Sequence, residues 1–495
     1  MGSIKSSLSL KQQDKDRSSG LESDEEYRDR WITIRVVYFS GFLMFLSFGV
    51  VATGLWPYLE NMDPTARKTF LSALFAAPPA GQLLFSPLIG WCSTRLSSIR
   101  IPFVLLTVLF ILANGLYSVI ELFPVPYRKF VMLFSRFMFG IATSINTLSR
   151  AYLSTATKMC ERTQAISMSS FAQTLGLAVG PIIPASVSAV GEVGFTICGV
   201  RFNMYTLGGW ICAAVGAVYI IFLNPSYFKH CNIAAKEALR KCGGTVEKDT
   251  RQPLNFFSIW MIMLSYGVLM FFYVLFQAVI SPISLDQFAW SHEQSLFYLG
   301  ILLPSGTACS CVVFLLLPQL CQRFSEHNVF VYFAMLPLFL SQIVMIPIGS
   351  NKIQIAVPQN GSDTGPTNGC SISQEWCNSV PSINHYQLVV SYALLCISFS
   401  VGIAISQTIL SKHLGTRPQG NWMALYTSIG GIMRIIGPGG VMIYVSLGTY
   451  WLFGLGSAVS GLVLMWVWMC KGHLRYSKKS IVAAEVQLML IQPKQ

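Results

Sequence analysis

Residues 132–155 read MLFSRFMFGIATSINTLSRAYLST, and Arg136 and Arg150 carry the only charges in this stretch. A helix needs roughly 20 mainly apolar residues to cross a bilayer, so the stretch is long enough to do so. The chain as a whole has a membrane composition, because only 11% of its residues are charged, against about 25% in ordinary soluble domains. A helix that keeps two arginines in such a setting needs a physical reason.

Apolar runs of similar length recur along the 495 residues. They cover residues 36–55, 70–89, 101–120, 130–153, 165–190, 204–223, 256–280, 296–317, 329–348, 388–410, 422–445 and 447–470. This pattern predicts an all-α integral membrane protein with twelve transmembrane helices in two six-helix bundles. The predicted parts are a disordered cytosolic tail at 1–31, bundles at 32–223 and 256–470, a cytosolic linker at 224–255, a lumenal loop at 349–386 and a cytosolic tail at 471–495.

The distribution of basic residues predicts the orientation, since Lys and Arg accumulate on cytosolic segments. If both tails are cytosolic, the cytosolic segments hold 24 Lys and Arg and the opposite face holds 6. The other four lie in predicted helices: Arg35, Arg136, Arg150 and Arg434. This bias explains most of the net charge of +13, so we expect a lipid bilayer as partner and no nucleic acid.

The loop at 349–386 carries two features of a lumenal segment. Asn360 begins the triplet NGS, an N-glycosylation acceptor that is used only on a lumenal face. Cys370 and Cys377 lie in a polar part of the loop, where an oxidising lumen favours a disulfide; two free thiols are the alternative. The thirteen cysteines show no zinc-ligand spacing, so we expect neither a metal nor a cofactor.

Arg136 and Arg150 fall on one polar stripe of the predicted helix 130–153 and its end. At about 100° per residue, one face collects Arg136, Gly140, Thr143, Thr147, Arg150 and Ser154. A polar stripe on an otherwise apolar helix is typical of a cavity lining. An arginine near mid-bilayer costs roughly 2.5 to 3.5 kcal/mol on insertion scales, so Arg136, and Arg434 in the eleventh run, need a partner or a function. Arg150 has the alternative of snorkelling to the interface.

None of the 21 acidic residues lies well inside a predicted helix, so the membrane interior is formally cationic. Arginines and hydroxyl donors without acids favour an anionic ligand. We therefore predict a central site for a small anion at Arg136, Arg150 and Arg434, with Thr143 and Thr147 beside them. Tyr273 and Gln277, one turn apart in the seventh run, are further candidate hydrogen-bond donors.

The two halves share a trace of internal repeat. The fifth run contains LGLAVGPII with Gly180 and Pro181, and the eleventh contains IGGIMRIIGPGG with Gly437 and Pro438. Each is the penultimate run of its half. Small residues at such spacing let helix backbones approach closely, so these helices are expected to pack tightly.

Several motifs resemble those of the major facilitator superfamily of twelve-helix secondary transporters. The stretch GWCSTRLSSIR at 90–100 resembles its Gly-x-x-x-Asp-Arg-x-Gly-Arg motif, with Thr94 and Ser97 departing from it. Arg136 with Gly140 matches its fourth-helix Arg-x-x-x-Gly pattern, and GLAVGP matches its fifth-helix motif. The resemblance implies a transporter in which helices one, four, seven and ten line a central cavity.

Dispersed segments resemble lysosomal members of this superfamily. They are EEYRDRW, SPISLDQFAWSHEQ, GCSISQEWC, RPQG and RIIGP. This closer resemblance implies a lysosomal or endolysosomal protein that conducts chloride, with distant relatives among vacuolar phosphate transporters; Gln277 stands where some of them have Glu.

Three functions remain open. They are a small-anion transporter or channel, an alternating-access transporter of an organic or phosphate solute, and a transport-silent scaffold. An enzyme is not expected, since the chain has no metalloprotease, nucleophile-elbow or phosphate-loop motif.

Overall fold

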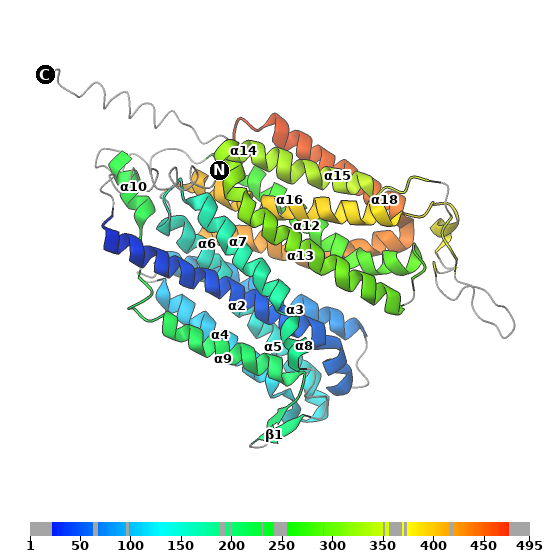
Figure 1. Cartoon of the computed structure of the whole chain (residues 1–495), viewed down its shortest axis with the longest axis horizontal. Coiled ribbons are helices and arrows are strands. Elements are labelled where there is room, and N and C mark those ends of the chain that lie inside the picture. Colours follow the sequence, from blue (N-terminus) through cyan, green and yellow to red (C-terminus); the bar gives the residue numbers. More distant parts are fainter. Residues whose placement is uncertain are drawn as a thin grey trace, which may run out of the picture.

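The computed structural model describes residues 22–62, 68–95, 99–187, 194–197, 200–229, 231–241, 255–290, 292–349, 352–355, 369–370, 374–415 and 419–474. Asn360, the predicted glycosylation site, lies outside the described residues. The described part is almost entirely helical and forms two bundles that lie side by side (Figure 1).

The described residues of the N-terminal half form eight helices, one 3-10 turn and a short antiparallel hairpin. Their bounds are α2 Asp24–Met62, α3 Lys68–Arg95, α4 Arg100–Ser118, η1 Ile120–Leu122, α5 Val125–Ala142, α6 Ile145–Ala156, α7 Arg162–Val179, α8 Ile182–Val187, β1 Phe195–Ile197, β2 Val200–Phe202 and α9 Thr206–Phe222. The linker to the second half contains α10, Ile233–Lys241.

The C-terminal half is built in the same way. Its elements are α12 Phe256–Asp286, α13 His292–Arg323, α14 Glu326–Val329, the π-helical turn η3 Phe330–Met335, α15 Leu336–Val344, η4 Glu375–Asn378, α16 His385–Leu414, α17 Gly420–Ile436, η5 Gly437–Gly439 and α18 Gly440–Met469. We call the end that carries α10 the linker end and the end that carries β1 and β2 the hairpin end (Figure 1).

Within the described residues, ten helical stretches are long and apolar enough to cross a membrane. The last of them, Gly420–Met469, has 50 residues and includes a sharp turn at Gly448, so it holds two crossings. Together with the shorter apolar helix Thr206–Phe222, this is consistent with the predicted twelve. The turn at Gly448 lies next to the predicted boundary between the last two spans.

The first helix corrects the predicted start of the first bundle. Helix α2 begins at Asp24, so the prediction of a disordered tail over 1–31 is wrong for its last part. Ser23 and Glu26 form a capping box, in which each side chain accepts from the other's backbone N–H at 3.2 Å. Arg30 then pairs with Glu22 and Glu161, both at 2.8 Å, which fixes this turn against the bundle.

Each half has its own apolar core, and small residues set how closely its helices pack. A Cβ on Gly176 would lie 2.3 Å from the Phe42 carbonyl oxygen, so α7 rests directly on α2. A Cβ on Gly440, the first residue of α18, would lie 2.3 Å from the Leu275 side chain of α12. The eleventh span therefore also approaches the first helix of its half closely. The penultimate span of each half thus packs closely on the first span. The repeat predicted the close packing, and the structure shows the partner.

The turn between the last two spans depends on Gly448. Its φ of 83° lies in the left-handed region, and a Cβ there would be 2.6 Å from the ring of Trp376. Trp376 donates from Nε1 to the Val445 carbonyl at 3.1 Å. The disulfide between Cys370 and Cys377 lies in the same loop, so this loop packs onto the turn.

Gly448→Ala should destabilise the protein. This positive-φ, extended backbone is essentially restricted to glycine and costs a residue with a Cβ roughly 1 to 3 kcal/mol, and the contact with Trp376 adds to that cost. Thermal unfolding of the purified protein in detergent measures the effect. Gly454→Ala in the same helix is the control, because its Cβ would meet nothing within 4 Å. Equal melting temperatures for the two variants would contradict this account.

Candidate functional site

The fourth span is interrupted between α5 and α6, where the sequence predicted one continuous helix. Around Thr143 and Ser144 the backbone bonds shorten to three residues, as in Asn146 N–H to Thr143 O at 3.0 Å and Thr147 N–H to Ser144 O at 2.9 Å. The Thr143 carbonyl also accepts from Gln82 Nε2 of α3, at 3.1 Å. Irregular backbone at membrane depth is tolerated only inside protein or along a cavity, so this break marks a candidate site.

Arg150, on α6, reaches across to the C-terminal half. Its Nη1 donates to Thr427 Oγ1 of α17 at 2.9 Å. Its guanidinium also lies over the ring of Tyr426, 5.2 Å from the centroid. Arg150 therefore does not snorkel to the membrane surface, because its side chain turns toward the interface between the halves.

Arg434, on α17, makes the reciprocal contact. Its Nη2 donates to Gln82 Oε1 of α3, in the N-terminal half, and its Nε donates to the Gly430 carbonyl at 3.4 Å. Arg150 and Arg434, which we call the arginine pair, are close enough to repel each other. Each half thus sends one arginine to a neutral partner in the other half.

No carboxylate neutralises the arginine pair among the residues that the structure describes. The ion pairs among the described residues involve other cations, namely Arg30, Lys158, Arg201, Lys229, Lys236 and Lys412. Two guanidiniums without an acid give this part of the interface a positive potential, which attracts an anion.

Two stacked tyrosines flank the arginine pair. The rings of Tyr266 and Tyr426 lie 3.9 Å apart, centroid to centroid. The Tyr426 hydroxyl and Ser406 Oγ share a hydrogen bond at 2.8 Å, and Gly430 leaves room for the Tyr266 hydroxyl. This stack gives the arginines a rigid aromatic surface on the C-terminal side.

Arg136 is not part of this arrangement. It lies on α5, and its guanidinium contacts the ring of Tyr117 on α4 at 4.4 Å. Fourteen residues separate it from Arg150, roughly 20 Å along a helix. Arg136 and Arg150 therefore do not share the common site that the single stripe predicted, because Arg136 contacts Tyr117 inside the N-terminal half and Arg150 contacts Thr427 across the halves.

The other predicted site residues take up different positions. Thr143 Oγ1 donates to its own helix, at the Gly140 carbonyl (2.6 Å), while Thr147 is buried with Oγ1 unpartnered. The Tyr273 ring stacks on Phe399 of α16 at 3.7 Å, and Gln277 is exposed one turn further on. Tyr273 and Gln277 share the face of α12 that carries Tyr266.

Sequence reasoning missed four residues of the site: Gln82, Tyr266, Tyr426 and Thr427. Gln82 gave a usable signal, because a glutamine inside an apolar span needs hydrogen-bond partners. The tyrosines and Thr427 gave none, since such residues are ordinary in membrane helices.

The halves also touch at the linker end. A Cβ on Gly90 of α3 would lie 2.5 Å from the Ala424 Cβ of α17. Arg162 Nη1 donates to the Ser411 carbonyl at 3.1 Å. Glu326 accepts from Thr163 Oγ1 at 2.5 Å and pairs with Lys412 at 2.6 Å. The structure is therefore a state in which the linker end is closed.

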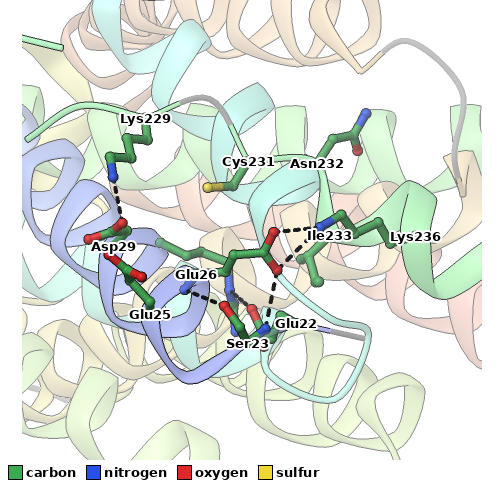
Figure 2. Close-up of a pocket in the computed structure, with 11 residues that line it drawn as sticks. Glu22, Ser23, Glu25, Glu26, Asp29, Lys229, Cys231, Asn232, Ile233 and Lys236 are labelled. Atoms are coloured by element: carbon green, nitrogen blue, oxygen red, sulfur yellow. Dashed lines mark hydrogen bonds and ion pairs between the residues drawn. The ribbon is translucent and has the colours of Figure 1, made fainter. Parts of the chain in front are cut away.

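A separate cavity of about 380 Å³ lies at the linker end, between the start of α2 and the linker (Figure 2). Its charges are largely paired with one another, as in Asp29 with Lys229 at 2.6 Å and Glu26 with Lys236 at 3.2 Å. These pairs attach the linker to α2, and we assign the cavity a structural role.

Comparisons with known proteins agree with this architecture. The Major Facilitator Superfamily family model matches residues 37–357, which is more than half of the chain. The chain therefore belongs to the major facilitator superfamily, and it is a multi-pass membrane protein of a transporter family.

Particular relatives are similar over nearly the whole length. "Major facilitator superfamily domain-containing protein 8" of Xenopus laevis is 29% identical over 473 residues, 90% of this chain and 92% of its own. The human organic anion transporter MFSD10 (TETRAN) superposes with a TM-score of 0.63 at 15% identity, over 88% of this chain and 99% of its own. The proton:xylose symporter XylE superposes with a TM-score of 0.60 at 14% identity, over 89% and 96%. The two structures show the shared fold.

Gly90→Val should open the linker end. The added side chain cannot fit between α3 and α17, so the population shifts away from the closed arrangement. Hydrogen–deuterium exchange of the purified protein should become faster in α17 and in the peptides around Arg162 and Ser411. Gly115→Val is the control, because a Cβ there meets nothing within 4 Å. Unchanged exchange at the linker end would show that this contact does not hold it closed.

Proposed function

We propose that this protein moves a small anion across an endolysosomal membrane, with chloride as the first candidate. The anion would bind between the halves at Arg150 and Arg434. The single observation that supports this most is that each arginine crosses the interface to a neutral partner, Thr427 or Gln82, while no acid among the described residues pairs with either guanidinium. A bound anion supplies the missing charge.

The arrangement suits alternating access, in which the halves rock around a site near the bilayer midplane. Both arginines contact the opposite half, so any rocking changes their partners. Their present acceptors are uncharged, and an anion is a stronger acceptor for a guanidinium than a hydroxyl or an amide. Binding and rocking are therefore coupled in this proposal.

The other predicted residues have subsidiary roles in the proposal. Thr147 Oγ1 is unpartnered next to the helix break, so it would add a hydroxyl donor. Thr143 would do the same on releasing the Gly140 carbonyl. Tyr273 and Gln277 continue the α12 face of Tyr266 toward the hairpin end, so they would line the way to that side.

The second candidate is a carboxylate-bearing or phosphate-bearing solute. The planar guanidinium matches two oxygens of such a group better than it matches a single spherical ion. The relative TETRAN is named as an organic anion transporter, which makes this class worth testing beside chloride. A transport-silent scaffold remains as an outcome of the same test.

The proposed location and orientation rest on the sequence. We propose an endolysosomal membrane because of the similarity to lysosomal members, and cytosolic termini because of the basic-residue bias. The linker end would then face the cytosol, and the disulfide loop and Asn360 would face the lumen.

Arg150→Ala and Arg434→Ala should each raise the anion concentration for half-maximal flux by about 10- to 100-fold, because hydrogen bonds to charged groups are worth roughly 1.5 to 3 kcal/mol. Chloride flux and current are measured in cells that carry the protein on the surface at matched levels. Arg28→Ala is the control, since it removes the same charge from an exposed position. The absence of an anion signal in the wild type, or a signal of equal size in all variants, would contradict the anion site at these two arginines. The first outcome would favour a transport-silent scaffold.

Arg434→Lys separates the two ligand classes. Lysine keeps the positive charge but lacks the planar fork. Chloride transport should therefore survive largely in this variant, whereas transport of phosphate or a carboxylate should be lost nearly as in Arg434→Ala. The same flux assay with each anion in turn gives the answer.

A further inference from the structure

Arg136 lies in the interior of the N-terminal half, away from the arginine pair. Its side chain is only 3% exposed. The face of its guanidinium lies on the ring of Tyr117 from α4, with the Phe139 ring of its own helix 5.4 Å away. Aromatic faces attract a cation, so these two rings account for part of its stabilisation.

One edge of this guanidinium is unoccupied. Nε and Nη2 are both buried and have no hydrogen-bond partner. These two nitrogens share an edge of the planar group, and their N–H bonds point in nearly the same direction, which is the fork that binds anions. The rings cover a face of the guanidinium and cannot accept these two in-plane hydrogen bonds.

The neighbours of Arg136 offer no counter-charge among the described residues. The Cys212 thiol of α9 lies within electrostatic range. Ser47 Oγ of α2 donates to Asn114 Oδ1 of α4 at 2.8 Å, and Asn114 Nδ2 donates to the Phe110 carbonyl at 2.9 Å. These groups are neutral and mostly bonded to each other. A buried charge left without a partner is strongly unfavourable.

We propose that Arg136 holds a resident small monovalent anion inside the N-terminal half, bound by its Nε and Nη2. The charge follows from a single guanidinium among neutral groups. The small size follows from the surroundings, because Tyr117, Cys212 and Asn114 are all at most 1% exposed. This site is distinct from the transport site, since the described contacts of Arg136 all lie in the N-terminal half, and its role is to stabilise that half.

The test measures thermal unfolding of the full-length protein in detergent at constant ionic strength, with chloride replacing gluconate, an anion too large for the site. The melting temperature of the wild type should rise with chloride, since a ligand of the folded state stabilises it in proportion to the logarithm of its concentration above Kd. In Arg136→Gln the dependence on chloride should disappear, whatever the absolute stability of this variant.

Arg150→Gln combined with Arg434→Gln is the matched control, because it removes the proposed transport site and should keep the chloride dependence. A wild type indifferent to chloride, or a dependence that survives in Arg136→Gln but not in the double variant, would overturn the proposal. A wild type whose melting temperature rises with chloride but that carries no anion flux would count against the proposed transport site alone.

Bromide provides a second measurement that needs no variant. A wild-type crystal grown in bromide should show an anomalous peak within hydrogen-bonding distance of Arg136 Nε and Nη2. The absence of a peak there would overturn the proposal even if Arg136→Gln fails to fold.

Discussion

Arg150 and Arg434 cross the interface between the two halves in opposite directions, and each ends on a neutral acceptor in the other half. Charges cannot be left alone in a low-dielectric interior without a large cost. Placing the arginines where two rigid bodies meet turns this cost into a preference for a ligand of one sign. No acid lies near them among the described residues, so the proposed selectivity for an anion and its coupling to movement both follow from that placement.

The arginines can serve this role only if the halves that carry them are rigid. Glycines provide the rigidity by letting backbones touch, as Gly176 does against Phe42 and Gly140 does against Pro78. The interface between the halves is different in kind, because it combines polar contacts with a few close approaches. Across it, a hydrogen bond such as that from Arg162 Nη1 to the Ser411 carbonyl contributes only about 1.5 to 3 kcal/mol. Rocking therefore breaks weak contacts and keeps strong ones.

The break in the fourth span affects the surroundings of three arginines, namely Arg136 and Arg150 of that span and Arg434 of α17. At the break the Thr143 carbonyl accepts from Gln82 as well as from Asn146 N–H, and Gln82 in turn accepts from Arg434. The break also separates the environment of Arg136, enclosed by α2, α4, α5 and α9, from that of Arg150 at the interface. One interrupted helix therefore carries two arginines in different surroundings, one inside the N-terminal half and one at the interface between the halves.

The sequence by itself determined the membrane class, the division into two halves and the tight packing of each penultimate span. These follow from the number and length of apolar runs and from local glycine patterns, which depend on neighbours along the chain. It also predicted the functional importance of Arg434 and Arg150, because the cost of an arginine in a bilayer does not depend on the fold.

Only the tertiary structure decided which residues meet. A regular helix over residues 130–153 predicted that Arg136 and Arg150 share one site. In the structure Arg136 contacts Tyr117 inside its own half, and Arg150 contacts Thr427 of the other half. Gln82 and Thr427 became site residues because α3 and α17 pack along each other across the halves. Contacts between positions hundreds of residues apart are set by the packing of whole helices, and no local pattern in the sequence encodes them.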